Sequence, residues 1–310
     1  ICDPHFIDLI FQYHKFDYLL HYAASTHVDR SIENASDFIQ DNVVGTHNLL
    51  EGCRKYKKNI VKIIHVSTDE VYGDIDTGEH VETDILKPSN PYSATKAAAD
   101  QLILAWARTY NIPYVIVRPT NNYGIGQYVE KLIPKSCKFL SLGRKIPLHN
   151  NGTPKRNWLH AKDTAEGIIT IINNDAKNEI FNIAGGFEQS NIITVEKIIS
   201  NYIGHLPDDY KEKYLDFSFQ RPGQDVRYAL NDNKLRSLGW KPEVNFDDVI
   251  GKIVEYYKKE LNLDALQEIV LTNVYTKSFT SIGKGLYENS TKDRENPQYI
   301  FLVPEFYYLL

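Results

Sequence analysis

Short apolar runs alternate with longer amphipathic segments along the first 260 residues. Runs rich in β-branched and aromatic residues are typical of buried strands. They predict strands at Tyr18–Tyr22, Val61–Val66, Tyr114–Arg118 and Glu179–Ile183. Apolar residues at helical spacing lie between these runs and predict helices over Phe38–Tyr56 and Tyr92–Tyr110. Strands that alternate with helices of this length indicate βαβ units, so we expect an α/β fold with a parallel sheet.

The pattern changes twice further along the chain. From Asn191 to about Glu260 it predicts helices with short extended pieces, the last helix covering Phe246–Lys259. After Glu260 the periodicity is weak, and Tyr, Ser, Thr and Asn are frequent. We therefore divide the chain into a first domain (1–190, with an insertion at about 126–160), a smaller lobe (191–260) and a tail (261–310) whose structure the pattern leaves open.

Composition narrows the classes of protein that remain. The 310 residues are 42% hydrophobic and 24% charged, which excludes collagen-like, coiled-coil and disordered chains. The net charge of −5 gives no electrostatic reason to expect a nucleic acid partner. No apolar run reaches the roughly 18 residues of a membrane-spanning helix, so we expect no membrane partner. Three widely spaced cysteines predict reduced thiols and a cytoplasmic location.

Tyr92 and Lys96 are four residues apart in the second predicted helix. Positions i and i+4 share one helix face, so the phenol and the ammonium point at one site. A nearby cation favours the phenolate, which would make Tyr92 a better proton acceptor. The same spacing also occurs in ordinary helices, so the meaning of the pair depends on what lies near it.

A hydroxyl and two adjacent carboxylates, those of Thr68, Asp69 and Glu70, follow the predicted strand Val61–Val66. In open α/β sheets, ligands bind beyond the carboxyl ends of the strands, which is where these residues would lie. Adjacent carboxylates on a solvated loop are usually only surface charge. Because these two end an apolar strand and precede the helix of Tyr92, we favour a reactive site.

The order of these motifs resembles the extended short-chain dehydrogenase/reductase family, and within it the dTDP-glucose 4,6-dehydratases. The segments that carry the resemblance are Ala23–Ser31, Asn42–Thr46, Ser67–Gly73, Pro91–Lys96, Asn121–Gly124, Glu130–Pro134, Arg156–Trp158, Phe181–Gly185, Arg221–Asp225 and Leu238–Pro242. The resemblance implies a Rossmann-like, doubly wound sheet that lacks its N-terminal strands. It also implies that 1–190 binds NAD and that 191–260 binds the substrate. The Thr-Asp-Glu triplet favours a dehydratase, because related sugar epimerases lack the carboxylate pair.

The resemblance implies an NAD-dependent lyase acting on a nucleotide sugar. Tyr92 would remove the proton of the sugar 4-hydroxyl as hydride leaves C4 for NAD. Thr68 would bind the forming ketone, and Lys96 would hold the nicotinamide ribose. Glu70 would then remove the C5 proton while a protonated Asp69 donates to the departing C6 hydroxyl. Two carboxyls in opposite protonation states suit such an elimination. Return of the hydride to C6 gives a 4-keto-6-deoxy sugar.

The resemblance also assigns residues to the two ligands. Those implied for NAD are Tyr22, Ala23, Ala24, Ser25, Thr26, Asn42, Ser67, Tyr92, Lys96 and Asn122. Those implied for the substrate are Thr26, Thr68, Asn121, Lys131, Leu132, Pro147, His149, Arg156, Asn191, Arg221 and Asp225. A guanidinium matches phosphate oxygens, which suits the two arginines to a diphosphate, although either alone could be a solvated surface charge. His149 stands where the family has an aromatic residue. We expect no metal site and, by analogy with the family, a homodimer.

The sequence departs from the family pattern at its start. The family opens with a strand, a G-x-x-G-x-x-G turn that binds the pyrophosphate, and a helix. This motif does not occur in the sequence. At roughly 30 residues per βαβ unit, about 60 residues of the family pattern are absent. Because the chain also contains no methionine, we expect a fragment of a longer enzyme, with an unpaired edge on the strand Tyr18–Tyr22.

Three other interpretations remain open. A UDP-glucose 4,6-dehydratase would act on a substrate whose base lacks one methyl group, and one methyl group changes the binding free energy only slightly. A sugar-nucleotide epimerase of the same fold is disfavoured by Asp69 and Glu70. A non-catalytic fragment unable to bind NAD would follow from the missing Gly-rich turn.

Overall fold

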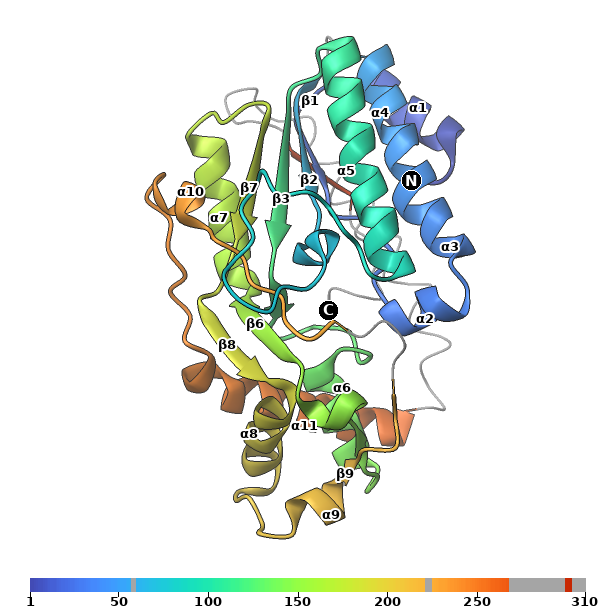
Figure 1. Cartoon of the computed structure of the whole chain (residues 1–310). Helices are drawn as coiled ribbons and strands as arrows, with labels where there is room; N and C mark the ends of the chain where they lie inside the picture. Colours follow the sequence, from blue (N-terminus) through green and yellow to red (C-terminus); the bar gives the residue numbers. More distant parts are fainter. Residues whose placement is uncertain (57–59, 221–224, 268–298, 303–310) are drawn as a thin grey trace.

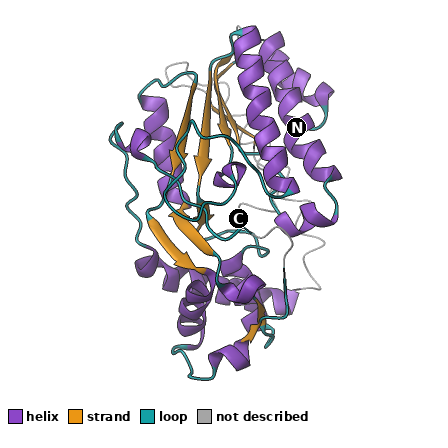
Figure 2. Ribbon diagram, viewed as in Figure 1, coloured by secondary structure: helices purple, strands orange, loops and turns teal. Residues whose placement is uncertain are grey.

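The computed structural model describes residues 1–56, 60–220, 225–267 and 299–302. Within these ranges five parallel strands form a large sheet in the order β10-β1-β2-β3-β7, with helices on both faces (Figures 1 and 2). The strands are β1 (Phe16–His21), β2 (Ile60–Val66), β3 (Tyr114–Pro119), β7 (Glu179–Ile183) and β10 (Tyr299–Leu302). The α/β fold with a parallel sheet is confirmed, and the four predicted strands are all present.

Alternation of side chains along the strands gives the large sheet two apolar faces. Leu19 and Ile63 point to one face and pack with the helices that cover it. These helices are α1 (Pro4–Tyr13), α4 (Gly45–Lys55) and α5 (Pro91–Tyr110). The next residues, Leu20 and Ile64, pack on the other face. That face is covered by α7 (Ala161–Asn173) and α10 (Asn233–Arg236).

The helices differ from the predictions in detail. The predicted helix Phe38–Tyr56 is observed as a succession of α3 (Ser36–Phe38), the π-helical segment η1 (Ile39–Val44) and α4. The prediction for Tyr92–Tyr110 corresponds to α5. Helix α1 was not predicted, although Ile7, Ile10 and Phe11 have helical spacing and pack in the core. Asp3 caps α1 by accepting from the backbone amides of His5 and Phe6.

A second layer lies at the carboxyl end of the large sheet. Its strands are β4 (Asn121–Tyr123), β6 (Lys155–His160) and β8 (Phe187–Ser190), together with the pair β5 (Ile146–Pro147) and β9 (Leu215–Asp216). Its helices are α6 (Leu132–Ser141), α8 (Asn191–Ile203), α9 (Tyr210–Tyr214) and α11 (Phe246–Gln267). The short segments α2 (Val28–Glu33), η3 (Asp69–Tyr72) and η4 (His149–Gly152) complete the described elements.

The two sheets meet at Gly185, directly after β7. A Cβ atom on Gly185 would lie 1.8 Å from the carbonyl oxygen of Trp158 in β6, so only glycine allows this approach. The backbone amide of Gly185 also donates to Asn157 Oδ1 at 3.1 Å. The main chain at the end of the large sheet is therefore in direct contact with the main chain of the small sheet.

Strand β10 corrects one expectation about the large sheet. It pairs with β1 from Tyr18–Tyr299 to His21–Leu302, so the expectation of an unpaired edge on this strand is wrong. Helix α11 continues to Gln267, beyond the predicted end at Lys259. The rest of the tail, 268–298 and 303–310, lies outside the described residues. The division into 1–190, 191–260 and 261–310 remains a prediction.

Candidate active site

The carboxylate pair lies where β2 ends. Thr68 caps the short helix η3, because its Oγ1 accepts from the backbone amide of Glu70 at 3.3 Å. The chain then turns at Gly73, whose φ is 81° and whose Cβ, if present, would lie 2.4 Å from the carbonyl oxygen of Lys87. These local features hold Asp69 and Glu70 at the carboxyl end of the sheet, as the sequence predicts.

Helix α5 brings Tyr92 and Lys96 to the same place. Asn90 caps the helix in a capping box with Ser93, and Pro91 occupies the first turn. Tyr92 is 7% exposed and Lys96 is 2% exposed. The Tyr92 hydroxyl forms a hydrogen bond with Thr68, which joins the helix to the strand end. The structure thus brings together all five predicted catalytic residues.

The two carboxyls have raised pKa values for a shared reason. Burial, followed by repulsion from Glu70, raises the pKa of Asp69 from 3.8 to about 7. Its Oδ1 accepts from Thr68 Oγ1 at 3.0 Å, while its Oδ2 has no hydrogen-bond partner among the residues that the structure describes. Burial also raises the pKa of Glu70, but the Arg156 guanidinium opposes this shift. Asp69 is therefore suited to remain protonated near neutral pH.

The pKa of Tyr92 differs from the sequence expectation. Burial raises the pKa of Tyr92, and repulsion from Glu70 adds to the shift. The Lys96 ammonium donates to the carbonyl oxygen of Val66 at 2.8 Å. Burial lowers the pKa of Lys96 to about 8. In the protein alone, burial therefore outweighs the cation that we expected to favour the phenolate.

A buried polar cluster that the sequence analysis missed lies beneath Lys96. His65 Nε2 lies 3.5 Å from both Lys96 Nζ and Asp100 Oδ1. Asp100 Oδ2 accepts from Arg118 Nε at 3.0 Å, and Arg118 Nη1 donates to the Tyr72 hydroxyl at 2.7 Å. Charged groups this deep are costly unless paired. The spacing of Asp100 from Lys96, one helical turn, was the available signal in the sequence.

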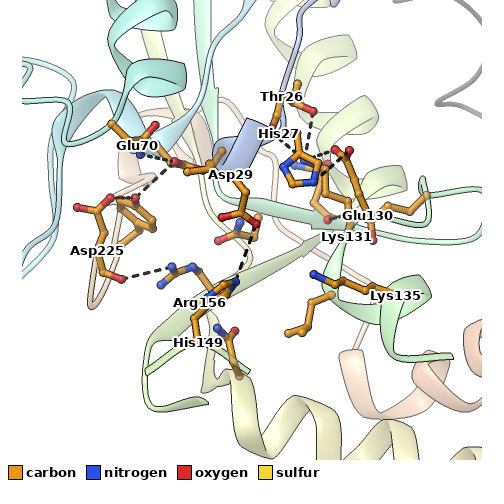
Figure 3. A pocket seen from close by; sticks show the side chains of 18 of the residues that line it. Thr26, His27, Asp29, Glu70, Glu130, Lys131, Lys135, His149, Arg156 and Asp225 are labelled. Atoms are coloured by element: carbon orange, nitrogen blue, oxygen red, sulfur yellow. Dashed lines mark hydrogen bonds and ion pairs between the residues drawn. The ribbon is translucent and has the colours of Figure 1, made fainter. Parts of the chain in front are cut away.

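A cavity of about 200 Å³ opens beside Glu70, between the two sheets (Figure 3). The predicted substrate residues that line it are Thr26, Asn121, Lys131, Leu132, Pro147, His149, Arg156, Asn191 and Asp225. Thr68 is not among the lining residues, and Arg221 lies outside the described residues. Lining residues that the analysis missed are His27, Asp29, Asn90, Glu130 and Tyr228, among others. Most of the predicted substrate residues thus line one cavity.

Several ion pairs order the cavity rim. Lys131 Nζ lies 3.1 Å from Glu130 Oε1 and donates to the Thr26 carbonyl oxygen at 3.0 Å. His27 Nε2 is 3.6 Å from Glu130 Oε2 on the same side of the cavity (Figure 3). The Arg156 guanidinium lies across the ring of Tyr228, 4.9 Å from its centroid, and donates to the carbonyl oxygen of Asp225 at 3.3 Å. Lys131 and Arg156 therefore bring positive charge to a cavity that Asp29, Glu70, Glu130 and Asp225 also line, and the guanidinium suits the oxygens of a phosphate.

The predicted cofactor residues Tyr22 to Thr26 follow β1, and Asn42 holds this segment in place. Asn42 Oδ1 accepts from the Ser25 amide at 2.8 Å, while Asn42 Nδ2 donates to the Ser25 carbonyl oxygen at 3.0 Å and to Thr95 Oγ1 at 2.9 Å. The segment is thereby tied to α5, next to Tyr92 and Lys96. These residues fit the nicotinamide end of a dinucleotide, which needs a shaped backbone and a nearby cation.

The described residues contain neither a candidate metal site nor a membrane-spanning helix. In the ranges that the structure describes, no group of three or more His, Cys, Asp or Glu side chains could hold a metal ion. No helix in the same ranges is both long enough and apolar enough to cross a membrane.

Comparisons with known proteins identify the family. A sequence model of the family described as "GDP-mannose 4,6 dehydratase" matches residues 1–253. The chain belongs to this family. It is 39% identical over 262 residues to the dTDP-D-glucose 4,6-dehydratase of Mus musculus, which spans 84% of this chain and 73% of the mouse protein. It is 38% identical over 272 residues to the dTDP-glucose 4,6-dehydratase of Haemophilus influenzae, with coverage of 83% and 80%.

Solved structures of the 4,6-dehydratase family share the fold. The dTDP-glucose 4,6-dehydratase DesIV from Streptomyces venezuelae, crystallised with NAD bound, matches with a TM-score of 0.78 and 35% identity, covering 84% of this chain and 79% of that chain. A UDP-glucose 4-epimerase from Thermotoga maritima matches with a TM-score of 0.75 but 25% identity, covering 84% and 83%. The resemblance that we inferred from the motifs is confirmed, and the dehydratase has the higher identity of these two.

Proposed function

We propose that the chain is a nucleotide-sugar 4,6-dehydratase that converts dTDP-glucose to dTDP-4-keto-6-deoxyglucose. The observation that carries the proposal is the Asp69–Glu70 pair beside the cavity, with burial raising the pKa of Asp69 to about 7 and Arg156 opposing the rise at Glu70. Such a pair can supply one acid and one base to a single elimination. The dehydratase relatives align with more than four fifths of this chain at 38–39% identity.

The residues of the chain divide the reaction between them. Tyr92 accepts the proton of the 4-hydroxyl. Thr68, which is hydrogen-bonded to Tyr92, binds the oxygen of the forming ketone. The ketone acidifies the C5 proton, which Glu70 removes. Asp69 donates its proton to the C6 hydroxyl, so that water leaves as the C5–C6 double bond forms. The chemistry that NAD supplies when bound is removal of a hydride from C4 and its return to C6.

Positive and polar groups provide the proposed binding sites. Arg156 and Lys131 face the cavity and would bind the diphosphate, with Asn121, Leu132 and Asn191 beside them. The segment Tyr22–Thr26, together with Asn42, Ser67, Lys96 and Asn122, would hold NAD at its nicotinamide end. We also retain a homodimer, a cytoplasmic location and the absence of a nucleic acid partner as parts of the proposal.

The test is turnover of dTDP-glucose with NAD present at high concentration. We expect a product that has lost one water, detected by mass spectrometry, and no such product from Glu70→Gln. UDP-glucose in a parallel reaction distinguishes the second candidate, which the structure permits because one methyl group separates the bases. A product of unchanged mass from the wild-type chain would indicate an epimerase and would refute the proposal.

A further inference from the structure

A chain of hydrogen bonds leads from Glu70 along the cavity wall to Ser89, which lies outside the cavity lining. Tyr228, which the sequence analysis did not select, has its hydroxyl 3.4 Å from Glu70 Oε2. The same hydroxyl donates to Asp225 Oδ2, and this oxygen also accepts from Ser89 Oγ. Glu70 and Asp225 lie on the same side of the cavity, with Arg156 nearby (Figure 3).

The burial of these groups gives the chain a direction. Tyr228 is 3% exposed and Asp225 is 4% exposed, whereas Ser89 lies on an exposed loop. The path therefore begins at the base beside the cavity, crosses two buried groups and ends at the protein surface. Glu70, Tyr228 and Asp225 all line the cavity, so a nucleotide sugar bound there would cover them, and Ser89, outside the lining, gives the path its contact with water.

Tyr228 is suited to transfer a proton without becoming charged. Burial, together with the carboxylates of Glu70 and Asp225, raises the pKa of Tyr228, so the hydroxyl stays neutral. A neutral hydroxyl can accept a proton from one neighbour while it donates its own to the next. Arg156, stacked on the ring of Tyr228, keeps that ring in place.

We propose that Tyr228 and Asp225 form a proton relay that connects Glu70 to solvent during the dehydratase reaction. After Glu70 takes the C5 proton, the protonated carboxyl donates to the Tyr228 oxygen, and Tyr228 passes its own proton to Asp225. Asp225 releases a proton to water at Ser89. The reverse sequence returns a solvent proton to C5 as hydride reaches C6. Glu70, Tyr228 and Asp225 all end in their starting states. This inference rests on the proposed function.

The isotopic test follows C5 in deuterated water. We expect the wild-type product to carry deuterium at C5. In Tyr228→Phe the ring is kept and the hydroxyl lost, so the rate of C5 exchange should fall by about 10² or more, the lower end for a positioned proton-transfer group. The product should then retain its original hydrogen. Asp225→Asn should act in the same direction, and Tyr13→Phe, at a residue 74% exposed on α1, is the matched control.

A second measurement separates this inference from the proposed function. In protein labelled with ¹³C at the tyrosine Cζ, the Tyr228 signal is the one lost in Tyr228→Phe. Its position should change in both Glu70→Gln and Asp225→Asn, and stay unchanged in Tyr13→Phe. A signal insensitive to Glu70 or Asp225 overturns the relay, whether or not the chain turns over substrate. Product with full C5 exchange in Tyr228→Phe also overturns it, while leaving the dehydratase assignment intact.

Discussion

Replacing Asp69 by Asn should change how the stability of the protein depends on pH. The pKa of this carboxyl is raised in the folded state from 3.8 to about 7, chiefly by burial. A raised carboxyl pKa means that the folded state holds its proton more tightly than the unfolded state. The stability linked to this proton is therefore present at low pH and is lost as the pH rises towards 7.

The size of the effect follows from the two pKa values. Between pH 5 and pH 8, ionisation of Asp69 should remove about 2 to 3 kcal/mol of the free energy of unfolding. Asn at this position has no charge to bury, and its amide oxygen can still accept from Thr68. The variant should therefore lack this part of the pH dependence, whatever its absolute stability.

Urea unfolding at pH 5 and pH 8 measures the difference for the parent and the variant. Asp208→Asn, at an exposed carboxylate in the turn before α9, controls for loss of a surface charge. The reasoning is refuted if Asp69→Asn loses as much stability between the two pH values as the parent does. That result would mean that Asp69 is ionised in the fold well below pH 7, and its role as an acid would lose its support.

Three further predictions concern the site and its supports. Tyr92→Phe should form no NADH absorbance with substrate, whereas Glu70→Gln should accumulate NADH and a 4-keto hexose, with turnover reduced about 10² to 10⁴-fold. Asp100→Asn should cost about 3–5 kcal/mol in urea unfolding by breaking a buried pair with Arg118; an unchanged midpoint would contradict this. Gly185→Ala should lower the free energy of unfolding by about 1–3 kcal/mol or more, because its methyl group would overpack against Trp158. A Tm equal to that of the parent would contradict the close approach.

Local pattern was enough to predict much of the large sheet. The strand ending at Val66 and the helix carrying Tyr92 both show their signal within a few residues, because burial of a strand or of one helix face leaves a period in the sequence. The position of the Thr-Asp-Glu triplet followed from the strand that precedes it. These predictions needed no knowledge of which distant segments meet.

Features that depend on distant pairing were not predictable in this way. Strand β10 is recognised by its register with β1, some 280 residues earlier in the chain, and short strands carry little signal of their own. Tyr228 gains its role only when its loop folds against Glu70. The ammonium of Lys96 was expected to favour the Tyr92 phenolate, but in the fold it donates to the carbonyl oxygen of Val66, and burial dominates the pKa of Tyr92.

The backbone crossing at Gly185 also determines how a ligand can enter. Glu70 lies in η3, which follows a strand of the large sheet, and Arg156 lies in β6 of the small sheet, so both sheets contribute to the cavity lining. Because main-chain atoms of the two sheets are in contact at this glycine, the sheets cannot separate there by a hinge motion. Entry of a ligand into the cavity then depends on the segments at the cavity rim and not on separation of the two sheets. The distance between the Asp69–Glu70 pair and Arg156, the proposed diphosphate-binding residue, is consequently fixed before substrate binds. This fixed distance would select sugar nucleotides by their length.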